Sequence, residues 1–192
     1  GVSGKWQSGA QLAEGEYFNI DQDRVIVHVD CPQDKIIIQL NAELNKTYLW
    51  YGKKEMRHFY ARNQVEQDAN AAQYSSSAFV GRTIAKAGDT YRNDKRDIID
   101  MVAEDARALE KIQEDELPDR LRKMPLAERM LTVETLAKSR QRLKQRIAKL
   151  KTQRESYLAA QRQQVEGSNE VTLGDAVTSA VRKQLRRIGF EL

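Results

Sequence analysis

The 192-residue chain has 40% hydrophobic and 31% charged residues, a mean hydropathy of −0.70, and only 10 glycines and 3 prolines. This composition excludes a disordered chain, disfavours a sheet-rich domain, and predicts long solvent-exposed helices. The net charge of +4 does not by itself indicate a nucleic-acid partner, and the single cysteine, Cys31, excludes a disulfide framework and a cysteine-based zinc site.

The first 53 residues are predicted to be an α/β segment. A short helix from Trp6 to Ala13 leads into two strand-like runs, EYFNI over 16–20 and VIVHV over 25–29. After Cys31 and Pro32, a helix capped by Gln33 or Asp34 is expected to reach Gly52. Its apolar stripe consists of Ile36, Ile37, Leu40, Leu44 and Tyr48. We therefore expect the closing strand and last helix of a layered α/β domain whose earlier strands lie outside this sequence.

Residues 54–93 are predicted to be a helical connector. A polar, alanine-rich helix over 64–73 is followed by the serine run Ser75 to Ser77, which is expected to interrupt or recap it. The sequence YSSS over 74–77 lacks the strand, tight glycine turn and helix that position a catalytic serine, so it is interpreted as a loop.

Residues 94–192 are predicted to form a helical hairpin and a short C-terminal helix. Asp94 is expected to cap an amphipathic helix that Pro118 ends, and a second helix should run from Pro125 to about Glu166. In this second helix, apolar residues alternate with Arg140 and Arg154 in a heptad seam of Val133, Leu136, Leu143, Ile147, Leu150 and Tyr157. The two arginines disfavour a long apolar zipper and favour antiparallel packing against the preceding helix. The last helix carries the stripe Leu173, Val177, Val181 and Leu185.

Several segments together resemble the C-terminal part of bacterial von Willebrand factor type A domain proteins that carry a long helical extension. They are, in order, LAEGEYFNIDQD, DCPQDKIIIQLNAELNKTYLWYG, NQVEQDANAA, TYRNDKRDIIDMV, EDELPDRLRKMPLAER, QRLKQRIAKLKTQRESYL and VRKQLRRIGF. The resemblance implies a mainly α chain with a small α/β part: the terminal strand and helix of a Rossmann-like domain over 1–53, followed by an antiparallel hairpin or coiled-coil extension.

The resemblance also implies a role in adhesion or assembly, commonly through a bound divalent cation, in a protein that is often exported. The family's metal site needs an Asp-x-Ser-x-Ser loop, because a hard cation such as Mg²⁺ takes oxygen ligands from several loops. This sequence contains no such loop. We therefore expect no metal or cofactor in this chain, and Mg²⁺ only in the earlier part of the domain.

The strongest charge cluster is a basic run without acids on the second long helix, and it is a candidate polyanion-binding site. Its members are Lys138, Arg140, Arg142, Lys144, Arg146, Lys149, Lys151 and Arg154. The favoured alternative is that this helix faces the acidic stretch Glu104, Asp105, Glu110, Glu114, Asp115 and Glu116 across the hairpin.

The remaining candidate residues are interpreted as structural. His28 and His58 have no partner at metal or catalytic-triad spacing. The carboxylate pairs formed by Asp97 with Asp94 or Asp100 are expected on a solvated face. The aromatic group Trp50, Tyr51, Phe59 and Tyr60 is expected to pack at a domain junction.

The sequence therefore predicts a protein–protein interaction or scaffold module without catalysis. Its partner is expected to be another protein or a second copy, through a sheet edge or the hairpin. Polyanion or nucleic-acid binding by the helix from Lys138 to Arg154 is the alternative. No stretch reaches the ~18 apolar residues that span a bilayer, so no membrane insertion is expected.

Overall fold

The computed structural model describes residues 6–12, 29, 31–165, 173–187 and 189–190. The chain divides into two compact units, one of His28–Gln161 and one of Gly1–Val27 with Arg162–Leu192. The described residues are mainly helical, which confirms the mainly α prediction, and they contain no strand beyond an isolated bridge between Trp50 and Asp97. The strands predicted over 16–20 and 25–29 lie outside the described residues except for Val29, which belongs to no strand.

The smaller unit contains two helices that the sequence predicted. Helix α1 spans Trp6–Leu12 and α8 spans Leu173–Arg187. Val177 and Val181 of α8 lie on the predicted apolar stripe, and both side chains are exposed.

Helix α2 spans Pro32–Asn45 and begins as its sequence requires. Pro32 lies in the first turn, where its missing N–H has no helical partner to lose. The N-cap is Cys31 without a side-chain cap, so the predicted cap by Gln33 or Asp34 is wrong. The helix also ends before Gly52, which has a φ of 103° and precedes the next helix. The apolar stripe is buried as predicted, except for the exposed Ile36.

Helices α3 (Lys54–Tyr74) and α4 (Ser76–Ala87) form an antiparallel pair. Ser75 recaps the chain as predicted, since its side chain accepts a hydrogen bond from the Ala78 N–H at 3.0 Å. The loop expected over 74–77 is therefore a single non-helical residue. Asp68 on α3 pairs with Arg82 and Lys86 on α4, which requires the chain to reverse at Ser75.

The helix predicted from Asp94 to Pro118 is wrong, because the chain breaks into short pieces. Helix α5 covers only Ile98–Glu104, and its N-cap is Asp97, whose carboxylate accepts from the Asp100 N–H at 3.2 Å. Two 3-10 turns follow, η2 (Ala108–Lys111) and η3 (Glu114–Glu116), and then a one-turn helix α6 (Asp119–Arg122). Leu109, Leu117 and Leu121 in this broken segment are buried together in one core.

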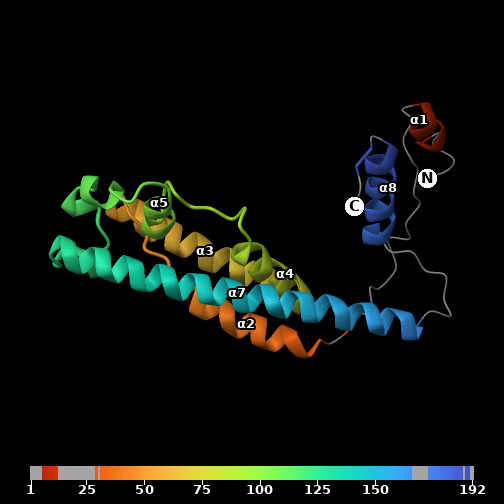
Figure 1. Ribbon diagram of the computed structural model, residues 1–192, viewed down its shortest axis with the longest axis horizontal. Helices are drawn as coiled ribbons and strands as arrows, with labels where there is room; N and C mark the ends of the chain where they lie inside the picture. The colour runs from red at the N-terminus through yellow and green to blue at the C-terminus, as the bar shows by residue number, and fades with distance from the viewer. Residues whose placement is uncertain (1–5, 13–28, 30, 166–172, 188, 191–192) are drawn as a thin grey trace. The chain divides into compact units, whose positions relative to one another are not determined.

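Helix α7 spans Leu126–Val165, close to its predicted limits. Its heptad seam faces the interior, where Val133, Arg140 and Ile147 are buried. Its antiparallel neighbour, however, is α2, because Arg154 contacts Asp34 and Arg140 contacts Thr47. Figure 1 shows α2 and the α3–α4 pair lying along α7. The predicted hairpin between α7 and the segment before it is therefore wrong, since that segment holds no helix of matching length.

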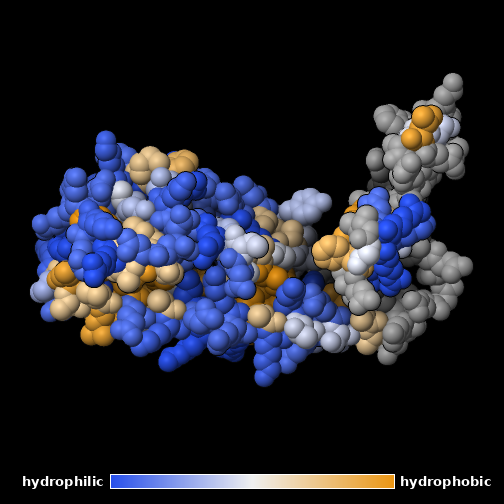
Figure 2. All heavy atoms as spheres, turned by 45° about the horizontal axis from the view of Figure 1, so that its top comes forward, coloured by the Kyte–Doolittle hydropathy of each residue, from blue (hydrophilic) through white to orange (hydrophobic). Residues whose placement is uncertain are grey.

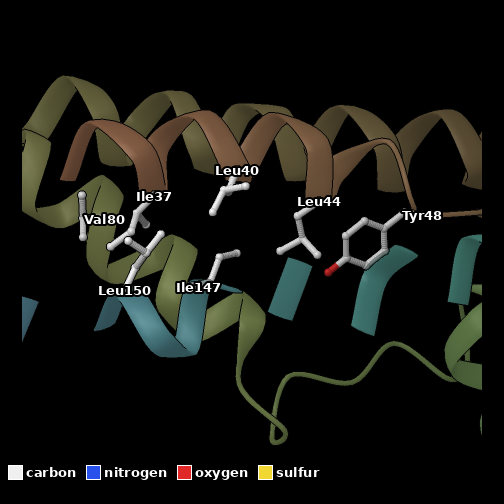
Figure 3. Close-up of a cluster of buried hydrophobic side chains, with 7 residues drawn as sticks. All are labelled: Ile37, Leu40, Leu44, Tyr48, Val80, Ile147 and Leu150. Carbon is white, nitrogen blue, oxygen red and sulfur yellow. The ribbon is translucent and has the colours of Figure 1, made fainter. Parts of the chain in front are cut away.

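Two apolar cores lie end to end along α7. The first joins α2, α4 and α7, and Figure 3 shows its side chains converging between these helices: Ile37, Leu40, Leu44, Tyr48, Val80, Ile147 and Leu150. The second joins α5, the short turns and the start of α7: Leu49, Ile98, Ile99, Leu109, Leu117, Leu121 and Val133. Each buried leucine or isoleucine contributes about 1.5–3 kcal/mol to stability.

The boundaries predicted near residues 53 and 93 fall inside one compact unit. Val80 of the predicted connector belongs to the first core, and Leu49 belongs to the second. The aromatic residues near position 53 pack as expected, with the rings of Trp50 and Tyr60 6.1 Å apart, although Phe59 remains half exposed.

Candidate protein-docking groove

An open groove of about 960 Å³ lies between the start of α7 and the α5–η2 segment. Its lining is mainly apolar, and the buried side chains Ile99, Leu109 and Val133 of the second core form part of it. Met130 and Leu131 on α7 also line it and are 46% and 64% exposed. Figure 2 shows hydrophobic side chains among hydrophilic ones at the end of this unit where α7 begins.

The groove follows a second stripe on α7, adjacent to the buried seam. Its residues recur at alternating intervals of three and four: Ala127, Met130, Glu134, Ala137, Gln141 and Lys144. Such spacing keeps side chains on one face over several helical turns. The stripe runs from Ala127 to Lys144, which is 18 residues or roughly 26 Å of helix. Because alanines at 103, 106, 127 and 137 line the same groove, the backbone of another helix could approach closely.

A buried arginine network forms the polar wall of the groove. The guanidinium of Arg140 donates to the Asp97 carboxylate at 2.5 Å and to the Asp100 carboxylate at 2.7 Å. It also donates to the hydroxyl and the backbone carbonyl of Thr47 at 3.0 and 2.8 Å, and it stacks over the Tyr48 ring at 4.2 Å. Arg140 therefore connects α7 to α2 and α5 at the boundary between the two cores.

Burial and neighbouring charges shift the pKa values of Arg140 and Tyr48 in opposite directions. Burial alone would lower the pKa of Arg140, but the hydrogen bonds and negative charge of Asp97 raise it above the usual value. Burial also raises the pKa of the Tyr48 hydroxyl, while the positive charge of Arg140 opposes that shift. Both side chains therefore keep their protons at neutral pH. Arg140 remains a cation, and its hydrogen bonds hold Asp97, Asp100 and Thr47 in place beside the groove.

The structure divides the predicted basic run into structural and exposed residues. Arg140 is buried, and Arg154 pairs with the buried Asp34 at 2.7 Å. Lys138 pairs with Glu134 and Lys151 with Glu155, each within α7. Among the described residues, the other members form no ion pair: Arg142, Lys144, Arg146 and Lys149.

The expected neutralisation of this run by the acidic stretch is wrong. Glu104 pairs with Arg92 and Asp105 pairs with Lys111, so these acids are satisfied locally. Within the described part of the chain, no acid between 104 and 116 pairs with a cation of α7. The physical reason is that the broken segment after α5 folds against the start of α7 and not alongside its basic half.

A second buried charge cluster joins α2, α3 and α4. The ammonium of Lys86, which is 0% exposed, donates to Asp68 at 3.0 Å and to Asn41 at 2.9 Å. Burial lowers the pKa of Lys86, and the hydrogen bonds and charge of Asp68 oppose this shift. Arg82 and two asparagines also bind the Asp68 carboxylate, so the buried carboxylate and ammonium are both compensated, although the buried Nη2 of Arg82 has no hydrogen-bond partner among the described residues. We interpret this cluster as structural.

The described residues bring together no catalytic or metal-binding group at the remaining candidates. His58 is exposed on α3, whereas His28 lies outside the described residues. Cys31 is buried, and its thiol donates to the Gln33 side chain at 2.8 Å. Among the described residues there is no group of three or more His, Cys, Asp or Glu side chains that could hold a metal ion.

The sequence interpretation missed the role of Asp97 and Asp100. These acids were expected on a solvated face, but Asp97 is 0% exposed and pairs with Arg140. The available signal was the arginine at a core position of the heptad seam, since a buried cation needs a buried acid. Met130 and Leu131 gave no comparable signal, because their exposure depends on how α5 and η2 fold.

Comparison of the chain with protein-family models, with curated proteins and with solved structures gave no match.

Proposed function

We propose that this chain is a protein–protein interaction module without catalytic activity, which binds its partner through the groove between α7 and the α5–η2 segment. The observation that supports this proposal most is the exposure of Met130 and Leu131 beside a largely apolar lining. Exposed apolar surface in a groove is energetically unfavourable in water, and its burial by a partner would recover roughly 25 cal/mol per Å².

The parent protein that we propose is a von Willebrand factor type A domain protein, with residues 1–53 as the end of its α/β domain. The support is the ordered set of segments that resemble this family. An exported location is part of the same proposal. The sequence lacks the Asp-x-Ser-x-Ser loop, so we assign it no metal or cofactor.

Site-specific photocrosslinking tests the groove. A photoreactive phenylalanine analogue at position 130 should form covalent adducts in cells that make the parent protein. The same analogue at Val65 on α3, whose side chain is 61% exposed against 46% for Met130, should form none. Similar adduct patterns at both positions, or no adduct at position 130, would contradict a docking role for the groove.

A second candidate function is binding of a polyanion such as duplex DNA by the exposed part of the basic run. The specific observation is that Arg142, Arg146 and Lys149 are exposed on one face of α7 and form no ion pair within the described residues. Cations that contact phosphates release counterions, so binding should weaken steeply with salt.

Fluorescence anisotropy with a DNA duplex tests this function. At about 50 mM salt, the triple variant Arg142→Gln/Arg146→Gln/Lys149→Gln should bind more weakly than wild type, and its salt slope should fall by about 0.9 per lost contact. The control variant Lys53→Gln/Lys54→Gln/Lys95→Gln removes the same charge from exposed positions elsewhere and should bind like wild type. Equal losses in both variants would indicate only a dependence on net charge.

A further inference from the structure

Helix α8 of the smaller unit carries an apolar strip that is in contact with water. Val177 and Val181 are 49% and 47% exposed, and the partly buried Leu185 follows at the same spacing. Residues four positions apart lie on one face of a helix, so the three side chains form a continuous strip along α8. We call these three residues the α8 strip.

The backbone after α8 folds back and holds another apolar residue at the end of this helix. The Gly189 N–H donates to the Arg186 carbonyl at 3.1 Å, and the Phe190 N–H donates to the Leu185 carbonyl at 2.9 Å. This pair of bonds is the Schellman pattern, which favours a left-handed residue, and Gly189 has a φ of 81°. The backbone of Phe190 is therefore fixed beside the last turn of α8, and this residue is 62% exposed.

The polar side of α8 is strongly basic. The helix has one acid, Asp175, and four exposed cations towards its C-terminal end: Arg182, Lys183, Arg186 and Arg187. A helix turns about 100° per residue, which places these cations roughly 100–160° round the axis from the middle of the α8 strip. By the same rotation, Arg182 and Arg186 lie on one side of the strip, and Lys183 and Arg187 lie on the other. Positive charge therefore flanks both edges of the apolar strip.

We propose that α8 binds the surface of an anionic lipid bilayer, with the α8 strip directed into the interface and the flanking cations at the level of the phosphates. An amphipathic helix with lysines and arginines on its polar face is the type that lies in the plane of such an interface. The long cationic side chains can reach headgroups while their apolar stems lie against the acyl chains. Phe190 adds an aromatic residue, a type that is enriched at this boundary.

The inference concerns a surface contact and goes beyond the docking role of the groove, with which α8 shares no residue. A helix that lies on a bilayer does not have to cross it. Among the described helices, none combines the length and the apolar composition that a membrane span requires.

The arrangement of charge on α8 favours a bilayer over other anionic partners. A soluble polyanion such as DNA would bind the cations and leave Val177 and Val181 in water. An acidic protein groove would need carboxylates along both of its rims to match the cations on both edges of the α8 strip. An anionic bilayer presents negative headgroups on every side of an embedded helix and covers the apolar strip as well.

Co-sedimentation of the whole chain with large unilamellar vesicles tests the proposal. At about 50 mM NaCl, the chain should bind vesicles of phosphatidylcholine with about 30% phosphatidylglycerol, and it should not bind phosphatidylcholine alone. Binding should weaken at least about tenfold towards about 500 mM NaCl, because salt screens exposed charges. A chain that stays in solution with anionic vesicles at low salt, or that binds both vesicle types equally, would overturn the proposal.

A charge variant tests whether α8 is the surface that binds. Arg182→Gln/Arg186→Gln/Arg187→Gln should weaken vesicle binding by about fivefold for each lost cation. The matched control is the α7 variant Arg142→Gln/Arg146→Gln/Lys149→Gln, which loses the same charge and should bind vesicles like wild type. Equal losses in the two variants would contradict a specific role for α8. Glutamine favours helix, and circular dichroism establishes that each variant keeps its helix content.

An apolar variant separates embedding of the α8 strip from adsorption by charge alone. Val177→Gln/Val181→Gln should weaken vesicle binding at least about tenfold, because two valines no longer leave water on binding. The control Met56→Gln/Val65→Gln changes two exposed apolar residues of α3 and should bind like wild type. Unchanged binding by the α8 valine variant would show that only charge is recognised, and the proposal would fail.

An environment-sensitive fluorophore reports the orientation of the bound helix. In a Cys31→Ser background, an NBD label on Val181→Cys should shift to the blue and brighten with anionic vesicles. The same label on Ser179→Cys, on the opposite side of α8, should change little. Equal responses at both positions, or no response at position 181, would overturn the proposed orientation. These outcomes do not depend on crosslinks from position 130, so the groove and the α8 surface can fail separately.

Discussion

Replacing Arg140 with methionine should destabilise the larger unit more than any other single change of charge on α7. The substitution keeps most of the side-chain volume but leaves the Asp97 carboxylate, which is 0% exposed, without its cation. Removing one partner of a buried ion pair costs about 3–5 kcal/mol. For a chain of this size, that loss lowers the melting temperature by roughly 6–20 °C.

Chemical denaturation followed by circular dichroism at 222 nm measures this loss. The matched control is Lys138→Met, which removes the same charge from an exposed position on the same helix, and it should stay within about 0.5 kcal/mol of wild type.

A double variant identifies the cause of the loss. Asp97→Asn keeps an oxygen that can accept from the Leu49 N–H, so Asp97→Asn/Arg140→Met removes both fully buried charges of the network and leaves only the partly exposed Asp100 carboxylate without its cation. We expect the double variant to be more stable than Arg140→Met alone, with a coupling energy of about 0.5–3 kcal/mol. An Arg140→Met variant within about 1 kcal/mol of wild type, or two substitutions whose effects simply add, would refute the assignment of Arg140 as a buried electrostatic connection.

Three further predictions concern the packing of α7 and the α3–α4 pair. Ile147→Ala should cost about 2–5 kcal/mol in chemical denaturation, because the side chain is fully buried in the first core, whereas an Ala148→Ser control on the exposed face should cost little. Ser75→Ala should cost about 0.5–2 kcal/mol through loss of the cap on α4, and Ser76→Ala should not; equal effects would contradict the cap. Burial of Asp68 acts to raise its pKa, but the hydrogen bonds from Asn41, Asn45 and Lys86 outweigh it and hold the pKa below its usual value. The stability from this depressed pKa is present above an ordinary aspartate pKa of about 3.9 and is lost as pH falls through the folded-state value. Stability measured over acidic pH should therefore fall less steeply for Asp68→Asn than for wild type, and parallel profiles would contradict this linkage.

Local signals in the sequence were sufficient to locate most of the helices. Pro32 and Pro125 mark the starts of α2 and α7, and Ser75 marks the junction of α3 and α4. These features act through bonds to the nearest turn, so they can be read without knowledge of distant residues. The heptad spacing on α7 likewise identified its buried face, including the two arginines that interrupt the apolar series.

Other features depended on contacts between residues far apart in the chain. The segment after Asp97 has a helical pattern, but it folds as short pieces whose Leu109, Leu117 and Leu121 share one core with residues far away in the sequence. The Arg140 network joins residues 43 and 93 positions away in sequence, which no local periodicity reports. The groove exists only because these turns leave part of α7 uncovered.

The sequence by itself determined that this chain is mainly helical, where its long helix lies, and which face of that helix is buried, because spacing and caps act locally. Only the tertiary structure decided that α2 packs against α7 and that Asp97 pairs with the buried Arg140. It also decided that, within the described residues, the acidic stretch over 104–116 does not pair with the basic run of α7. These outcomes depend on which apolar faces compete for the same core, and that competition involves the whole unit.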